Sequence, residues 1–220
     1  MSVVNAGGKR AEQASQTRRK IIAAAGELFV EQGYAATTLQ QVADRAGVAV
    51  QTIYFVFRNK RTLLKELADV TVAGDDEPVA TMDRPWFREA MAAGPAEEHL
   101  RRHVHGTRLI LDRVAAIAAM TQTAAATNPE VASLWTPAED PRFTVQLAAA
   151  RSLAGKPGAR PGLSAQRAAD LLYAMLSPAL YLVLVSDRGW PPEEFEDWAF
   201  HTLRDQLCEP EPEPEPRPAR

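Results

Sequence analysis

The stretch that decides the fold runs from residue 16 to residue 67 and reads QTRRKIIAAAGELFVEQGYAATTLQQVADRAGVAVQTIYFVFRNKRTLLKEL. Its first part repeats apolar residues at i, i+4, i+7 and i+8 from Ile21 to Phe29, which predicts an amphipathic helix. Thr37–Thr38 then marks a second helix start, because a Thr hydroxyl can accept from the free amides of a first turn. That short helix stops at Gly47.

A third helix is expected at about 49–56, and its junction with the second, Ala46-Gly47-Val48, has the pattern of a helix-turn-helix. The turn needs a residue that tolerates a left-handed backbone, which glycine does, and the following valine can fill the space between the two helices. A helix-turn-helix lays its second helix in the major groove of DNA. The sequence therefore predicts a DNA-binding unit.

The residues of that second helix suit base reading. Gln51 can make paired hydrogen bonds to adenine, Thr52 can contact a base or a phosphate, and Val50 can meet a thymine methyl. Asn59 begins a longer helix, and Lys60 at its start places a positive side chain beside exposed amides. Such an arrangement predicts a phosphate contact.

The stretch resembles the DNA-binding domain of the TetR family of transcriptional regulators. The residues that carry the resemblance are RRKIIAAAGELFVEQGYAATTLQQVADRAGV, at 18–48, and TIYFVFRNKRTLL, at 52–64. It implies an all-α homodimer in which three helices bind DNA, a fourth links, and C-terminal helices bind an effector and form the dimer. Carried over position by position, it implies DNA contacts at Thr38, Gln40, Gln51, Thr52, Tyr54 and Lys60, with Tyr54 and Lys60 on phosphates.

Two positions depart from the family pattern. Ala49 replaces the Ser or Thr that often caps the recognition helix, which loses a cap worth about 1 kcal/mol. Val56 stands where the family often has a polar residue that faces the groove, and Phe55 precedes it. The reading surface is therefore unusually apolar, and we expect thymine-methyl contact or shape readout to outweigh hydrogen bonding.

Charge is divided unevenly along the 220 residues. Residues 1–65 hold ten Lys and Arg against four acids, a net charge of +6, and the other 155 residues hold 15 against 24, a net charge of −9. A basic end on an acidic body suggests an anionic partner, with nucleic acid the first candidate and an anionic membrane surface the second. One cysteine, Cys208, and a start without an apolar leader indicate a cytoplasmic protein without disulfides or membrane spans.

Beyond residue 74 the periodicity stays helical, and no run fits a strand. Helices are expected near 84–93, 96–126, 129–135, 140–154, 164–187 and 192–207. The fold class is therefore all-α. The expected division is a flexible basic arm at 1–15, a helix-turn-helix domain at 16–72, a helical effector and dimerisation domain at 80–208, and a disordered Glu/Pro tail at 209–220.

The expected helix at 164–187 is too apolar all round for a surface helix, and Pro178 should bend it. It fits either a buried central helix or, with the helix at 192–207, half of a four-helix dimer interface. We expect the interface, because a dimer gives a helix-turn-helix protein two half-sites. The candidate anchors are Leu176, Leu180, Leu184 and Trp198.

Aromatic and sulfur side chains in the C-terminal part suggest an apolar cavity for a small apolar or aromatic effector, although such stripes also occur in plain cores. The candidate effector contacts are Trp86, Met91, His103, Met120, Gln122, Tyr173 and Tyr181. His99 and His103 have a spacing that metals accept, but no third ligand accompanies them, so neither a metal nor another cofactor is expected.

The sequence thus predicts a dimeric regulator that binds an operator in double-stranded DNA, with repression released by an effector. An enzyme is not expected, because the chain has no Gly-rich phosphate loop, nucleophile elbow or HExxH helix. A membrane-surface or adaptor protein, or a small enzyme without a recognisable motif, stays open as the alternative.

Overall fold

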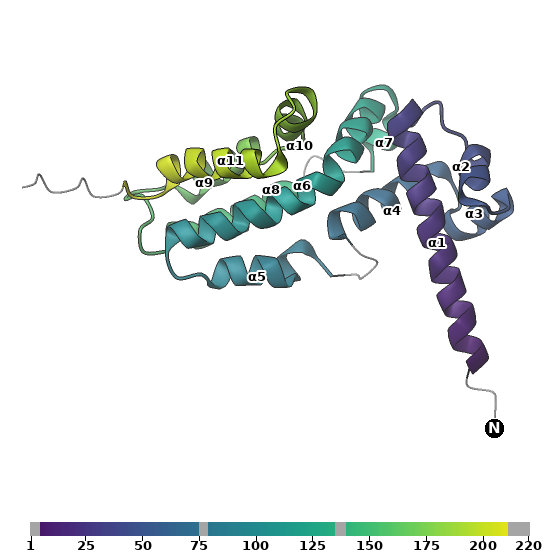
Figure 1. Cartoon of the computed structure of the whole chain (residues 1–220), viewed down its shortest axis with the longest axis horizontal. Helices are drawn as coiled ribbons and strands as arrows, with labels where there is room; N and C mark the ends of the chain where they lie inside the picture. Colours follow the sequence, from purple (N-terminus) through teal and green to yellow (C-terminus); the bar gives the residue numbers. More distant parts are fainter. Residues whose placement is uncertain (1–4, 75–78, 135–139, 211–220) are drawn as a thin grey trace, which may run out of the picture. The chain divides into compact units, whose positions relative to one another are not determined.

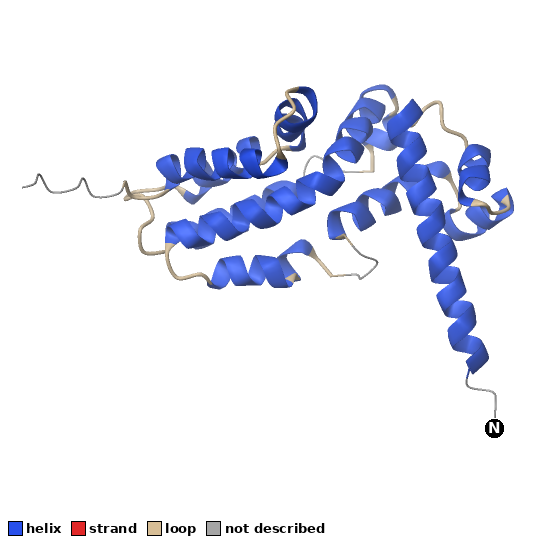
Figure 2. Ribbon diagram, in the orientation of Figure 1, coloured by secondary structure: helices blue, strands red, loops and turns tan. Residues whose placement is uncertain are grey.

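The computed structural model describes residues 5–74, 79–134 and 140–210. Those residues are helical apart from turns, loops and one isolated bridge between Ala159 and Cys208, and they contain no β-strand (Figure 2). The all-α prediction is therefore confirmed. Nearly all of the expected Glu/Pro tail lies outside the described residues.

The described residues form two compact units, labelled by helix in Figure 1. The first unit combines the N-terminal 78 residues with 113–139, and the second combines 79–112 with the rest of the chain from 140. The expected division instead assigned everything from 80 to 208 to one domain. It differs because Ile117, Ala124 and Val131 are buried in the core of the first unit.

The first unit is built on α1, which packs against α2 and α4. Its core centres on fully buried Phe29, Ile53, Phe57 and Leu64. Its elements are α1 (Asn5–Gln32), α2 (Leu39–Ala46), α3 (Val50–Phe57), α4 (Lys60–Ala73), the part of α6 (Ala96–Thr127) from Arg113, and α7 (Pro129–Ala132).

Helix α1 begins at Asn5, so most of the expected flexible arm at 1–15 is helical; residues 1–4 lie outside the described part. The side chains of residues 10–16 are exposed, whereas burial starts at Ile21. Strong helix formers fill 9–13 (KRAEQ), and elongating an existing helix is far easier than nucleating one. The packed part of α1 therefore supports an exposed extension.

The predicted helix boundaries around α2 follow from capping. Thr38 is the N-cap of α2 and forms a capping box with Gln41, and Gly47 ends the helix in the left-handed region at φ 67°. Asn59 caps α4 by accepting from Thr62 N (2.8 Å). Ala49, at the N-cap of α3, makes no side-chain cap, as its side chain predicts.

The second unit buries Leu100, Leu153, Phe195 and Phe200, and its α8 and α9 pack side by side. Its elements are a 3₁₀ turn η1 (Thr81–Asp83), α5 (Pro85–Ala92), α6 up to Asp112, α8 (Pro141–Ala154), α9 (Ala165–Met175), α10 (Pro178–Tyr181), a π-helical turn η2 (Leu182–Asp187) and α11 (Pro192–Leu207).

The single helix expected at 164–187 is instead three pieces, α9, α10 and η2. Pro178 has no N–H to continue a helix but suits a first helical position, and Ser177 caps the new start by accepting from Leu180 N (3.3 Å). One predicted dimer anchor, Leu176, lies next to this break and is fully buried within the chain, so it has no surface to offer to a second copy. Leu180, Leu184 and Trp198 remain partly exposed.

Candidate nucleic-acid interface

Two buried residues fix the orientation of α3. Ile53 and Phe57 are inserted into the core of the first unit, with 0% and 1% of their surface exposed. A helix turns by about 100° per residue, so Phe55, two residues from each, is rotated about 200° around the helix axis and points away from the core. Gln51 and Thr52, one turn earlier, flank that outward direction. The outer face of α3 is thus made of Gln51, Thr52 and Phe55.

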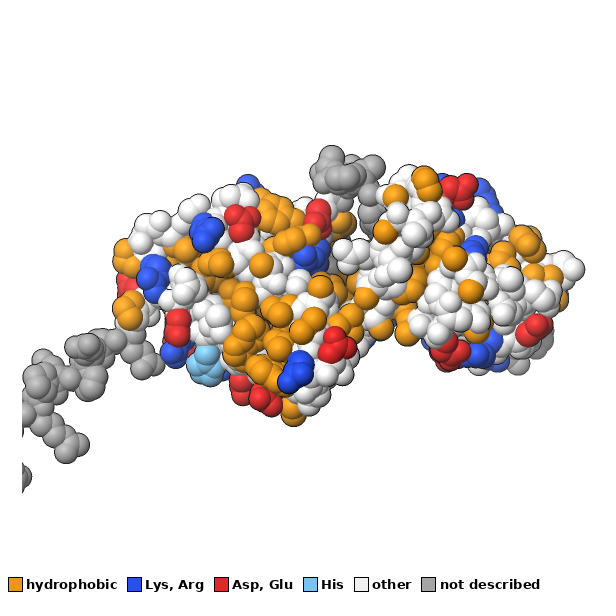
Figure 3. All heavy atoms as spheres, turned by 90° about the horizontal axis from the view of Figure 1, so that it is seen from above, with side chains coloured by type: hydrophobic (Ala, Val, Ile, Leu, Met, Phe, Trp, Pro, Cys, Tyr) orange, Lys and Arg blue, Asp and Glu red, His pale blue; other side chains and the backbone are white. Residues whose placement is uncertain are grey.

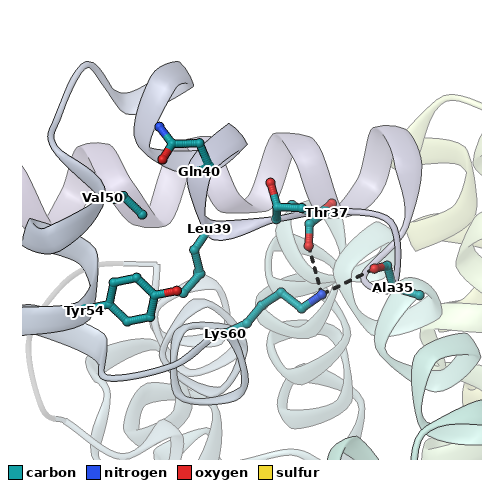
Figure 4. A pocket seen from close by; sticks show the side chains of 8 residues that line it. Ala35, Thr37, Leu39, Gln40, Val50, Tyr54 and Lys60 are labelled. Atoms are coloured by element: carbon teal, nitrogen blue, oxygen red, sulfur yellow. Dashed lines mark hydrogen bonds between the residues drawn. The ribbon is translucent and has the colours of Figure 1, made fainter.

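A shallow open depression lies beside that face, between α2, α3 and the start of α4 (Figure 4). It gathers five of the predicted DNA contacts. Its lining residues are Ala35, Thr37, Thr38, Leu39, Gln40, Val50, Tyr54 and Lys60. Gln51, Thr52 and Phe55 are not part of this lining.

Two of the polar residues in the depression are already engaged. Thr38 Oγ1 accepts from Gln41 N (3.2 Å) as the cap of α2. Gln40 Nε2 donates to Asp44 Oδ1 (2.8 Å), one turn along the same helix. Tyr54 is about half exposed, at 53%. Of these three side chains, that of Tyr54 is the one without a hydrogen bond to another described residue.

Lys60 does not lie as a phosphate contact requires. Its ammonium donates to the carbonyl oxygens of Tyr34 (2.8 Å), Thr37 (2.8 Å) and Ala35 (3.4 Å), and two of these bonds are drawn in Figure 4. It also lies 4.3 Å from the centre of the Tyr34 ring. Burial lowers the pKa of Lys60. Its charge therefore stabilises the turn between α1 and α2, which corrects the predicted clamp.

Other cations of the first unit are also neutralised. Arg45 forms ion pairs with Glu27 (3.1 Å) and Glu31 (3.0 Å), and the bond to Arg45 lowers the pKa of Glu31. Arg18 pairs with Glu66 and lies over the Phe57 ring. The charge of +6 counted over residues 1–65 therefore overstates what these residues can offer to an anion.

Arg58 is different, because it is exposed at the end of α3 and no ion pair or side-chain hydrogen bond is described for it. It is the one non-glycine residue with positive φ among those described, at φ 65° and ψ −49°. Asn59 N donates to Phe57 O (2.7 Å) across it, which closes a γ-turn of the strained kind. The sequence contains no sign of this turn, since neither Gly nor Asn stands at the strained position.

The candidate effector contacts do not form one group. Met120 packs against the core of the first unit, and Gln122 is exposed on the same part of α6. Neither belongs to the second unit, so they do not lie with the other candidates. The reason is that α6 passes from one unit to the other without a break that the sequence could reveal.

The polar groups among the remaining candidates are engaged within the chain. His103 is fully buried and its Nε2 donates to Gln146 Oε1 (2.7 Å). The Tyr173 hydroxyl donates to Asp140 (2.6 Å), and the Tyr181 hydroxyl donates to Asp112. The last bond helps to raise the pKa of Tyr181, although burial raises it more.

Trp86 and Met91 of α5 are half-buried. The Trp86 ring lies against the backbone of α6 at Gly106, where an added Cβ would be 2.1 Å from Trp86 Cε3. It also packs near His103, with 6.2 Å between ring centres. Trp86 therefore fills a site that only glycine leaves open.

His99 and His103 stack with 6.4 Å between ring centres, and both are fully buried. Burial lowers the pKa of both rings, that of His99 to about 4, where the neighbouring His103 adds to the effect. Within the described residues no group of three His, Cys, Asp or Glu side chains could hold a metal ion.

These features define a helix-turn-helix unit whose second helix, α3, is exposed, and comparison with known proteins shows what this unit is similar to. Residues 21–67 match the model described as bacterial regulatory proteins, tetR family. The chain is 45% identical over 58 residues to the HTH-type transcriptional regulator TtgR of Pseudomonas putida. That match covers 26% of this chain and 28% of TtgR, so it spans little more than a quarter of this curated relative.

Solved structures extend the likeness to most of the chain as a matter of fold. A TetR-family regulator from Mesorhizobium loti superposes with a TM-score of 0.67 and 20% identity, over 89% of this chain and 98% of that one. NalD, described as the secondary repressor of the MexAB-OprM multidrug efflux pump in Pseudomonas aeruginosa, gives 0.62 and 20%, over 90% and 98%. Residues 21–67 are thus similar to the helix-turn-helix part of TetR-family regulators, and the chain has the fold of these solved structures.

Proposed function

We propose that the protein is a transcriptional repressor that binds an operator through α3 and acts in the cytoplasm. The observation that carries the proposal is the geometry of α3, which the core holds by Ile53 and Phe57 while Gln51, Thr52 and Phe55 face outward. The depression between α2 and α3 receives a backbone phosphate beside Thr38 and Tyr54, and Arg58 contacts the next phosphate. NalD, which shares the fold, is itself a repressor.

The test is binding to duplex DNA from beside the protein's own gene, measured by fluorescence anisotropy at several salt concentrations. With Lys60, Arg45 and Arg18 engaged within the unit, about two to four phosphate contacts remain per half-site. The slope of log K against log salt for a dimer is then roughly −4 to −7. A slope near zero, or equal affinity for unrelated duplexes, contradicts the proposal.

Dimerisation is the second part of the proposal, and the apolar segment Ala165–Asp187 supports it. The most apolar 18-residue window of the segment has mean hydropathy 1.8, and 28% of that window is buried within the chain. Hydrophobic side chains gather on the side of the second unit where α9 to α11 lie (Figure 3). A second copy that packs there covers Leu180, Leu184 and Trp198, and stable homodimers commonly bury more than about 2,000 Å².

By length and composition alone, Ala165–Asp187 and Ala96–Thr127 are also apolar enough to cross a membrane. The alternative of a membrane-surface protein can therefore be tested together with dimerisation. Sedimentation of the full chain at micromolar concentration, with and without anionic vesicles, separates the two. A dimer that does not bind vesicles supports the proposal, and Leu180→Glu should convert this dimer to a monomer. A monomer that binds vesicles refutes dimerisation and favours a membrane-surface protein.

An effector is the third part, and its chemistry is proposed as apolar or aromatic. Support comes from Trp86 and Met91, two half-buried apolar side chains of α5 in the second unit, of which Trp86 lies beside His103. A thermal-shift screen of apolar compounds, repeated in the presence of operator DNA, tests it. Compounds that stabilise the free protein should bind the DNA complex more weakly by the same factor by which they weaken DNA binding. Stabilisation by highly charged compounds alone contradicts this chemistry.

A further inference from the structure

Phe55 is by far the most exposed large apolar residue among those described. Its exposed fraction is 90%, whereas Tyr54 and Val56 beside it have 53% and 38%. Single exposed apolar side chains are common on proteins, but Tyr54, Phe55 and Val56, here called the apolar patch, spread apolar surface over about 200° of an eight-residue helix, and exposed apolar surface of this kind marks a contact surface. Phe55 therefore stands where a partner is expected.

The outer face of α3 offers little else to a partner. The helix VQTIYFVF contains no charged residue, and with Tyr54 at a phosphate its hydrogen bonding to bases rests on Gln51 and Thr52. Within the major groove, adenine offers an acceptor and a donor that match a glutamine amide. Thymine adds a methyl group, the one apolar group that a base edge presents there and one that Phe can contact.

The spacing of Gln51 and Phe55 relates the two contacts. Four residues of α-helix advance about 6 Å, and stacked base pairs repeat every 3.4 Å or so. Both side chains are on the same face, because residues i and i+4 are neighbours on a helix surface. The two contacts thus fall roughly one to two base pairs apart.

We infer that Phe55, with Val56 beside it, reads the C5-methyl groups of thymine in each half-site, next to an adenine bound by Gln51. The occupant of the apolar patch is thus the floor of the major groove. Attraction of DNA comes from the cations of residues 1–65 that are not paired within the chain, such as Arg58, and the methyl contact supplies discrimination. The inference rests on the proposed function, since it presupposes that α3 enters the groove.

The experiment begins with duplexes selected from a random-sequence library by the full-length protein. Each thymine of the selected half-site is then replaced by uracil, which removes the methyl and leaves base pairing intact. Loss of one buried methyl corresponds to about a fourfold weaker affinity. At the critical position, replacement in both half-sites of a dimer site should therefore weaken binding roughly 16-fold.

The protein variants show whether Phe55 is the reader. Phe55→Ala should bind the thymine duplex more weakly than wild type and bind thymine and uracil duplexes equally. Val30→Ala is the matched control, because Val30 is an exposed apolar residue of α1, and this variant should stay sensitive to uracil. Because the side chains of Phe55 and Val30 are both exposed, both variants should keep the wild-type circular dichroism and melting temperature.

Three results overturn the inference. If wild type selects a sequence whose thymines all tolerate uracil, or if Phe55→Ala remains as sensitive as wild type, the proposed function stands without methyl reading. If no sequence is enriched at all, the proposed function fails together with the inference. A Phe55 that contacts a membrane or another protein falls under the first of these outcomes.

Discussion

Replacing Arg58 by glycine should stabilise the protein while it weakens DNA binding. Arg58 adopts φ 65° and ψ −49° in the γ-turn that joins α3 to α4. Such a backbone costs about 1–3 kcal/mol for a residue with a Cβ, and glycine avoids most of that cost. Glycine also gains roughly 0.5–1 kcal/mol of chain entropy on unfolding. The net expectation is a gain of about 0.5–2 kcal/mol.

Arg58→Ala is the matched control. It removes the same charge and the same long side chain but keeps the Cβ, so the strain persists and stability should change little. The usual order is thereby reversed, because glycine normally destabilises relative to alanine. Both variants lose one cation per half-site, so the salt slope of DNA binding by a dimer should become shallower by about 1.8 in each.

The assay is urea unfolding followed by far-ultraviolet circular dichroism, with the three proteins compared under identical conditions. Anisotropy titrations with a selected duplex give the affinities and slopes. If Arg58→Gly is no more stable than Arg58→Ala, the strain at this turn is not real. If both variants keep the wild-type slope, Arg58 does not contact phosphate, whatever the stabilities show.

Three further predictions concern other parts of the chain. Lys60→Met should lower the free energy of unfolding by about 1–3 kcal/mol, because it leaves the carbonyls of Tyr34 and Thr37 without their donor. It should also weaken binding to all duplexes without changing the salt slope, whereas a slope shallower by about 1.8 would show that Lys60 contacts phosphate after all. Gly106→Ala should destabilise the protein by about 1–3 kcal/mol because the new Cβ collides with Trp86, whereas Gly26→Ala, whose Cβ meets the flexible end of Leu67, should be nearly neutral. If Gly106→Ala still destabilises in a Trp86→Ala background, the collision is not the cause. As the pH falls from 6.5 to 4, His99 alone should lower the free energy of unfolding by up to about 1.4 kcal/mol per pH unit, because the unfolded ring binds a proton that the folded ring, with a pKa of about 4, does not. Urea unfolding of His99→Gln should show a flatter pH dependence, and the control His201→Gln, at an exposed histidine, should match wild type.

Periodicity and capping residues were enough to predict the order of the helices. Thr38, Gly47 and Asn59 are located where the helix ends need them, and α11 has the expected bounds, 192–207. These features are local, so neighbouring residues suffice to specify them. The break at Ser177–Pro178 is also local, and a serine before a proline is a helix start that the apolar run around it concealed.

The site could be predicted only as far as residue type. A lysine at a helix start is compatible with a phosphate or with nearby carbonyls, and only the fold of the turn after α1 decides between them for Lys60. Likewise, His103 and Gln146 are 43 residues apart, and no local pattern pairs them. The exposure of Phe55 could be inferred from its distance to Ile53 and Phe57, but the strained turn at Arg58 has no sequence sign.

Because α6 contributes its second half to the first unit, residues 1–74 are not a module that can be cut out or exchanged. A fragment that ends after α4 lacks Ile117, Ala124 and Val131, and the core that they complete would be open to water. Gene fusion or recombination that swaps only the first 74 residues must supply a matching α6 as well. Helix α3 and the second half of α6 are therefore expected to be inherited together, even where the second unit diverges.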